Sequence, residues 1–103
     1  MANYLLLYHG GGMPESDEDK QKVMAAWGDW AKMVGDDIVD MGNPCSNVKN
    51  VTQSGVTEFS GDRVTGYSIV KADSMDKATE YAKGVPLVAD GGSVDVYETF
   101  PAM

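Results

Sequence analysis

The sequence predicts an α+β fold in which two helices cover one face of an antiparallel sheet. Two observations predict it. Strand-like apolar segments alternate with two segments that have the apolar spacing of helices, and their order along the chain is strand, helix, strand, strand, helix, strand. This is the ferredoxin-like βαββαβ order. With 103 residues and a hydrophobic content of 43%, residues 1–103 are expected to form a single domain.

The first strand is predicted from Tyr4 to Tyr8, a continuous run of large apolar or aromatic residues. Because side chains alternate along a strand, the even-numbered residues of this run lie on one face of the sheet and the odd-numbered residues on the other. Both faces are therefore apolar, but a single layer of helices covers only one of them. We expect a second copy of the chain to cover the other face, so that two sheets enclose a shared barrel in a homodimer.

The first helix is predicted from Asp17 to Val34, with Ser16 as its N-cap and Gly35 as its C-cap. Apolar residues at helical spacing form one stripe, which should lie on the sheet: Val23, Trp27, Trp30 and Val34. A glycine inside a helix costs about 1 kcal/mol relative to alanine. Gly28 is therefore expected to mark a close packing contact.

The middle of the chain contains three strand-like segments. Residues 38–41 are predicted as a short strand, and residues 48–52 either continue it or re-enter the sheet. Residues 56–59 and 64–72 are predicted to pair as a hairpin through the turn at residues 60–63.

The second helix is predicted to begin after Ser74, its N-cap, and to end at Gly84 and Pro86. Its apolar stripe is formed by Met75, Ala78, Ala82 and Val85. The last strand is predicted over residues 93–100, where apolar and polar side chains alternate.

The charge of the chain disfavours two classes of partner. Sixteen acidic and eight basic residues give a net charge of −8, which repels nucleic-acid backbones and anionic membrane surfaces. No apolar stretch is long enough to span a membrane, and no basic segment followed by a long apolar one is found at the N-terminus. We expect a cytoplasmic protein without nucleic-acid or membrane partners. Cys45 is the single cysteine, so an internal disulfide is excluded.

Three segments carry a resemblance that covers nearly the whole chain: YLLLYHG at the start, GYSIVKADSMDKATEYAKGVP in the middle and GGSVDVYETF at the end. They resemble the YCII-related family, also called the DGPF-domain family. The resemblance implies a dimeric α+β barrel fold, and most members of this family have no established activity.

The chain also departs from the pattern of this family. Where many relatives have Asp-Gly-Pro-Phe, residues 54–57 read Ser-Gly-Val-Thr, so only the glycine is kept. Enzyme-like relatives pair a histidine on the first helix with an aspartate just after the second. Here the first helix contains no histidine, and residues 84–87 after the second read Gly-Val-Pro-Leu. Neither member of that pair carries over.

His9 is the candidate catalytic residue, because unperturbed histidine titrates near neutrality and the glycines of residues 10–12 leave room for a ligand. A general base needs an orienting partner, and the fold could bring Asp40, Asp95 or Glu98 to it. The alternative is a histidine that simply ends a strand. The glycine run lacks the spacing of a nucleotide-binding loop and is interpreted as a connection.

An aromatic ligand pocket between helix and sheet is the second candidate site, formed by Trp27, Trp30 and Tyr67. The alternative is that these rings are ordinary core. One histidine and one cysteine, 35 residues apart, do not give the ligand spacing of a zinc site, so we expect neither a metal nor a cofactor.

Three functions remain open. The first is a small dimeric α+β barrel protein that binds a small organic molecule in the helix–sheet pocket. The second is an enzyme resembling the cofactor-independent isomerases or lyases of the same barrel superfamily, with His9 as general base. The third is an accessory or regulatory protein-interaction module.

Overall fold

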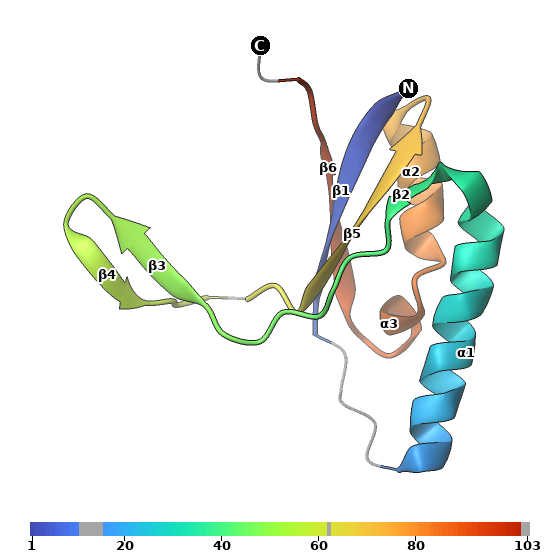
Figure 1. Cartoon of the computed structure of the whole chain (residues 1–103), viewed down its shortest axis with the longest axis horizontal. Helices are drawn as coiled ribbons and strands as arrows, with labels where there is room; N and C mark the ends of the chain where they lie inside the picture. The colour runs from blue at the N-terminus through green and yellow to red at the C-terminus, as the bar shows by residue number, and fades with distance from the viewer. Residues whose placement is uncertain (11–15, 62, 102–103) are drawn as a thin grey trace.

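The computed structural model describes residues 1–10, 16–61 and 63–101. Its elements, in chain order, are β1 (Ala2–His9), α1 (Asp17–Val34), the 3₁₀ turn η1 (Gly35–Asp37), β2 (Ile38–Asp40), β3 (Lys49–Thr52), β4 (Gly55–Glu58), β5 (Gly66–Ala72), α2 (Met75–Lys83), α3 (Pro86–Ala89) and β6 (Ser93–Glu98). The helices lie together on one side of a four-stranded sheet, and the β3–β4 hairpin projects from the other side (Figure 1).

The four-stranded sheet has the order β2-β5-β1-β6, and each neighbouring pair is antiparallel. Without the β3–β4 hairpin, the chain runs strand, helix, strand, strand, helix, strand, so the predicted ferredoxin-like α+β fold is confirmed. β1 lies between β5 and β6, so it is a central strand with no free edge.

The two faces of the sheet have different surroundings. Tyr4, Leu6 and Tyr8 of β1 are buried beneath the helices, as are the alternate residues of β5. The opposite face carries partly exposed side chains, and we call it the open face: Leu5, Leu7, His9, Tyr67, Ile69, Asp95 and Tyr97.

α1 has the predicted bounds. The Ser16 hydroxyl accepts a hydrogen bond from the Asp19 N–H at 3.1 Å, and Gly35 follows the last turn with a φ of 66°. The predicted stripe faces the sheet, with Trp30 and Val34 buried and the earlier members partly buried. The prediction for Gly28 is wrong, because a Cβ placed there would have no atom within 4 Å among the described residues.

α2 also begins as predicted, since the Ser74 hydroxyl accepts a hydrogen bond from the Lys77 N–H at 3.1 Å. Ala78, Ala82 and Val85 are buried as expected, but Met75 is largely exposed. Tyr81, which was not part of the predicted stripe, is buried in the core instead.

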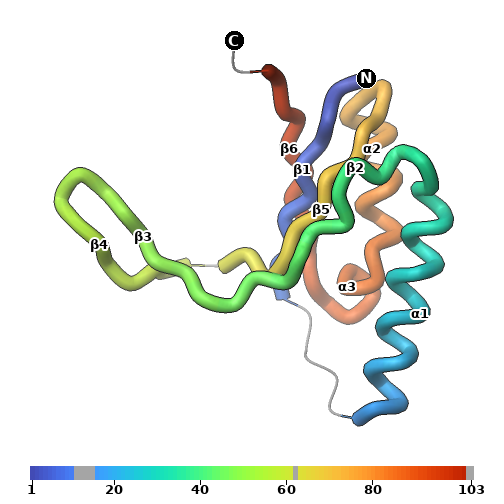
Figure 2. The backbone as a smooth tube through the Cα atoms, in the orientation of Figure 1, coloured from blue at the N-terminus to red at the C-terminus, as the bar shows by residue number. Residues whose placement is uncertain are grey.

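The predicted pairing of residues 56–59 with residues 64–72 is wrong. β4 pairs with β3 instead, with Val51 opposite Val56 and Lys49 opposite Glu58. β5 has no free edge for β4, because it pairs with β1 on one side and β2 on the other. The segment 48–52, left open above, therefore forms half of a separate hairpin, which we call the arm (residues 49–58) (Figure 2).

The arm leaves the sheet beside the C-terminal end of β1. Pro44 and Gly66 form a single bridge, and the Cys45 N–H donates to the Thr65 carbonyl at 2.9 Å. The Thr65 N–H donates in turn to the Tyr8 carbonyl at 2.7 Å. The base of the arm is thus hydrogen-bonded to the strand that carries His9.

The core contains a buried hydroxyl network. The Tyr8 hydroxyl donates to the Ser68 hydroxyl at 2.7 Å, which donates to the Met41 carbonyl at 2.6 Å. Ser68 is fully buried, so this network supplies the partner that its hydroxyl needs.

The stability of the protein is expected to fall as the pH rises above about 10. A hydrogen bond to Glu98 raises the pKa of Tyr4, and burial raises the pKa of Tyr8. A hydrogen bond to Asp37, 2.5 Å long, raises the pKa of Tyr81. These hydroxyls keep their protons in the folded state at a pH where the unfolded chain has lost them, so the free energy of unfolding decreases with pH. Urea midpoints at about pH 9 and about pH 11, with tyrosinate absorbance in parallel, measure the effect.

A Tyr81→Phe variant is the control for this pH effect. It lacks one of the three groups, so its urea midpoint should fall less over the same pH range than that of the wild type. Equal falls in both proteins contradict the contribution assigned to Tyr81.

No helix in the described part of the chain is long and apolar enough to cross a membrane.

Candidate active site

His9 is the last residue of β1 and lies on the open face. In the pairing of β1 with β6, Ser93 is opposite His9 and Asp95 is opposite Leu7. Asp95 is therefore the diagonal neighbour of His9 on the same face of the sheet. Its Oδ2 atom lies 2.8 Å from His9 Nε2.

The structure thus selects one of the three carboxylates considered above. Asp40 lies at the other edge of the sheet and accepts a hydrogen bond from the Gly42 N–H at 2.8 Å. Glu98 accepts one from the Tyr4 hydroxyl, also at 2.8 Å. Asp95 is the carboxylate that contacts His9.

The other ring nitrogen of His9 is enclosed by protein and has no hydrogen-bond partner among the described residues. With a carboxylate accepting at Nε2, the neutral ring carries its proton there, and Nδ1 presents a lone pair. A buried polar atom without a partner is costly, so Nδ1 needs a donor to satisfy it. A ligand hydroxyl is one such donor.

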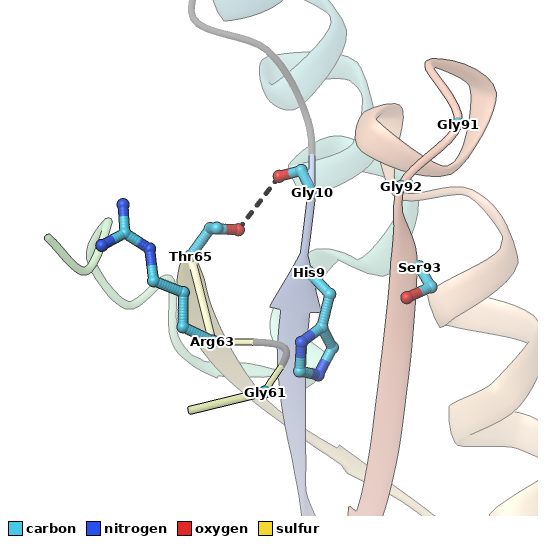
Figure 3. Close-up of a pocket in the computed structure, with 8 residues that line it drawn as sticks. All are labelled: His9, Gly10, Gly61, Arg63, Thr65, Gly91, Gly92 and Ser93. Carbon is cyan, nitrogen blue, oxygen red and sulfur yellow. Dashed lines mark hydrogen bonds between the residues drawn. The ribbon is translucent and has the colours of Figure 1, made fainter. Parts of the chain in front are cut away.

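A pocket of about 440 Å³ adjoins the imidazole (Figure 3). It is lined by residues from the ends of three strands and the turns beside them: His9, Gly10, Gly61, Arg63, Thr65, Gly91, Gly92 and Ser93. Most of these side chains are small, so the pocket is open to solvent and bounded largely by backbone.

Gly92 has a packing reason to be glycine. A Cβ at this position would lie 2.5 Å from Leu87 Cδ1 and 2.7 Å from the His9 carbonyl oxygen, closer than such atoms can approach. The backbone before β6 therefore packs directly against the residue that carries the imidazole, and this contact fixes the His9 end of β1.

Thr65 ties the pocket wall to β1. Its hydroxyl lies within hydrogen-bonding distance of the Gly10 carbonyl at 3.1 Å and the Tyr8 carbonyl at 3.2 Å (Figure 3). Gly10, with a φ of 77°, lines the pocket. The next two residues of the predicted glycine connection, 11 and 12, lie outside the described residues.

Among the residues that line the pocket, Arg63 is the one with a long cationic side chain. Its guanidinium points away from the imidazole (Figure 3), and Arg63 is exposed. It makes no ion pair with any other described residue.

The structure does not bring Trp27, Trp30 and Tyr67 together. The two tryptophan rings contact each other edge to face, with centroids 5.8 Å apart, and Trp27 contacts Tyr8 in the same way at 5.3 Å. Trp30 is buried, and its indole N–H donates to the Tyr81 carbonyl at 2.8 Å. Tyr67 lies on the open face, because its neighbours in β5 face the helices. The predicted pocket of Trp27, Trp30 and Tyr67 is therefore not formed. Trp27 and Trp30 contact each other on the helix side of the sheet, and Tyr67 lies on the opposite face.

Within the described ranges, no group of three or more histidine, cysteine or acidic side chains is placed to hold a metal ion. Cys45 is an exposed free thiol.

The sequence analysis missed Arg63, Thr65 and Gly92 as parts of the site. The first two were assigned to a hairpin that the chain does not form, so their position beside His9 was hidden. The two consecutive glycines before the last strand, Gly91 and Gly92, were the sequence signal that could have identified this part of the site.

The sequence matches no family model, and no curated protein matches it. The solved structures similar to it include that of 5-chloro-2-hydroxyhydroquinone dehydrochlorinase (TftG) from Burkholderia phenoliruptrix AC1100, in complex with 2,5-dihydroxybenzoquinone. The alignment covers 95% of this chain and 93% of that chain, with a TM-score of 0.58 and 17% sequence identity. At this identity the similarity shows the fold alone. It supports the ferredoxin-like α+β fold that the sequence predicted.

Proposed function

We propose that the protein is an enzyme of the lyase or isomerase type that acts on a small molecule. His9 transfers a proton in this reaction, and Asp95 orients the His9 ring. The observation that carries the proposal is the His9–Asp95 contact of 2.8 Å beside a pocket, with Nδ1 left without a partner among the described residues. A base held by a second residue is the arrangement that proton transfer requires.

The two residues have separate roles in this proposal. Asp95 accepts a hydrogen bond from the Nε2–H and so keeps the Nδ1 lone pair available. His9 Nδ1 then removes a proton from a ring hydroxyl. In an isomerisation, His9 returns this proton to another atom of the ligand. In an elimination, a carbon–chlorine bond of the ring breaks, chloride leaves, and the proton passes from His9 to solvent, so that HCl is lost overall. Nδ1 is enclosed in this conformation, so ligand binding must move part of the pocket wall, and catalytic hydrogen bonds often form only in the complex with substrate.

The ligand we propose is a small hydroxylated ring. The pocket volume lies within the range of small-molecule sites, near its lower end. A ring hydroxyl would supply the donor that Nδ1 lacks. The enzyme of the similar solved structure is named for 5-chloro-2-hydroxyhydroquinone, a ring whose hydroxyls keep their protons near neutral pH. The same ring without chlorine, 2-hydroxyhydroquinone, is therefore a suitable probe for a chain of the same fold. The ligand site that we propose lies at the strand ends and not between helix and sheet.

Binding of 2-hydroxyhydroquinone, measured by calorimetry in the absence of oxygen, tests the proposal. We expect saturable binding with a dissociation constant below about 1 mM. A His9→Gln variant should bind about tenfold more weakly, because one buried hydrogen bond is lost. Either no binding by the wild type or equal binding by the variant contradicts the proposal.

We further propose that two copies pair through their open faces, as expected from the first strand. Support comes from the apolar side chains on that face, which in a single chain are only partly covered: Leu5, Leu7, Tyr67, Ile69 and Tyr97. Burying them removes apolar surface from water at about 25 cal/mol per Å². We also propose membership of the YCII-related family, on the three segments quoted above.

A further inference from the structure

We propose that the arm, residues 49–58, packs against a second copy of this chain and clasps it in the dimer. The proposal rests on the open-face dimer proposed above and adds a second contact surface to it.

The arm has no support from its own chain. All eight residues of β3 and β4 are exposed. Val51 and Val56, opposite each other on one face of the hairpin, have exposed fractions of 70% and 65%. An isolated two-stranded hairpin is at best marginally stable in water, so an apolar face of this kind is stabilised by packing against something else.

The direction of the arm indicates what covers it. The helices lie on one side of the sheet and the arm extends on the other, the side of the open face (Figures 1 and 2). A second copy placed on the open face would therefore lie beside the arm. By two-fold symmetry, each arm would reach the other chain.

The area of the open face supports a second contact surface. The four strands contain 8, 3, 7 and 6 residues. At about 4.8 Å between strands and about 3.3 Å per residue, their flat footprint is about 400 Å². A standard-size interface buries about 800 Å² of accessible surface per partner. The arms supply additional area on the same side of the sheet.

Charge also favours a second copy. Two chains of net charge −8 repel each other, so their contact surfaces must be nearly neutral. The strands of the arm carry one basic and one acidic residue, Lys49 and Glu58, and these form an ion pair across the hairpin. The arm is therefore a neutral, partly apolar surface on a strongly acidic chain.

The arm is also connected to the pocket. Gly61 and Arg63 line both the His9 pocket and a hollow at the base of the arm, which Lys49, Glu58 and Phe59 complete with their neighbours. Packing of the arm against a partner would therefore restrict the movement of Gly61 and Arg63 in the pocket wall.

Sedimentation analysis of the wild type and two double variants tests the proposal. Val51→Asp with Val56→Asp places two charges on the apolar face of the arm. Asn50→Asp with Thr57→Asp places the same charges on its opposite face and is the matched control. We expect a wild-type dimer, at least a tenfold larger dissociation constant for the valine variant, and a smaller change for the control.

The outcomes separate the two proposals. A monomeric wild type overturns the open-face dimer and the clasp with it. A wild-type dimer whose dissociation constant is unchanged by the valine variant overturns the clasp alone, and so does an equal change in both variants. Far-UV circular dichroism establishes that each variant is folded, which is expected because the arm lies outside the core.

Discussion

Replacing His9 with glutamine is expected to lower the rate of the proposed reaction by about 10² to 10⁴-fold. Glutamine keeps a polar side chain at the end of β1 but has no basic nitrogen, so the proton acceptor is lost. Chloride release from 5-chloro-2-hydroxyhydroquinone, the substrate named for the similar solved structure, measures the rate. Wild-type protein that releases no chloride contradicts a lyase that eliminates chloride from this probe.

The role of Asp95 is distinguished from a purely structural one by comparing two carboxylates on the same strand. Asp95→Asn should lower the rate while leaving the urea midpoint nearly unchanged, since this carboxylate is more than half exposed. Glu98→Gln is the matched control, because Glu98 contacts Tyr4 and is not a neighbour of His9 in the sheet. Equal rates in the two variants would remove Asp95 from the mechanism.

Much of the fold follows from local sequence signals. Both long helices begin at a serine whose hydroxyl caps the first turn, and both N-caps were predicted. The apolar run of residues 4–8 was predicted as a strand, and it lies within β1. These features depend on neighbours along the chain, which the sequence contains directly.

The errors concern contacts between distant segments. Residues 56–59 were paired with the next strand because short connections are common, yet both edges of β5 are taken by β1 and β2. Tyr67 was placed in a ligand pocket between helix and sheet because it is aromatic, but the small residues Gly66 and Ser68 beside it face the helices instead. The space above Gly66 and Ser68 is filled by Tyr8, which also donates a hydrogen bond to Ser68.

The candidate site shows the same limit. His9 was identified from its type and position, but the choice among three carboxylates needed the register of β1 against β6. A shift of one residue in that register would turn Asp95 to the other face. Register is fixed by packing across the whole sheet, so the sequence could name the candidates without deciding between them.

Trp30→Ala is expected to reduce the free energy of unfolding by about 3 to 5 kcal/mol, a large part of the stability of a small domain. Trp30 is 2% exposed, packs edge to face with Trp27 and donates a hydrogen bond to the Tyr81 carbonyl, so it joins α1 to α2. Urea unfolding followed by far-UV circular dichroism measures the change. One fixed protein concentration is required, because the stability of a dimer depends on concentration.

Two further variants make this prediction testable even if Trp30→Ala does not fold. Trp30→Phe retains most of the buried ring and should lose less, because the Tyr81 carbonyl still accepts the Gly84 N–H at 3.1 Å. Met24→Ala, on the exposed side of the same helix, should change stability by no more than about 0.5 kcal/mol. If Trp30→Phe costs no more than Met24→Ala, Trp30 is not the residue that holds the two helices together.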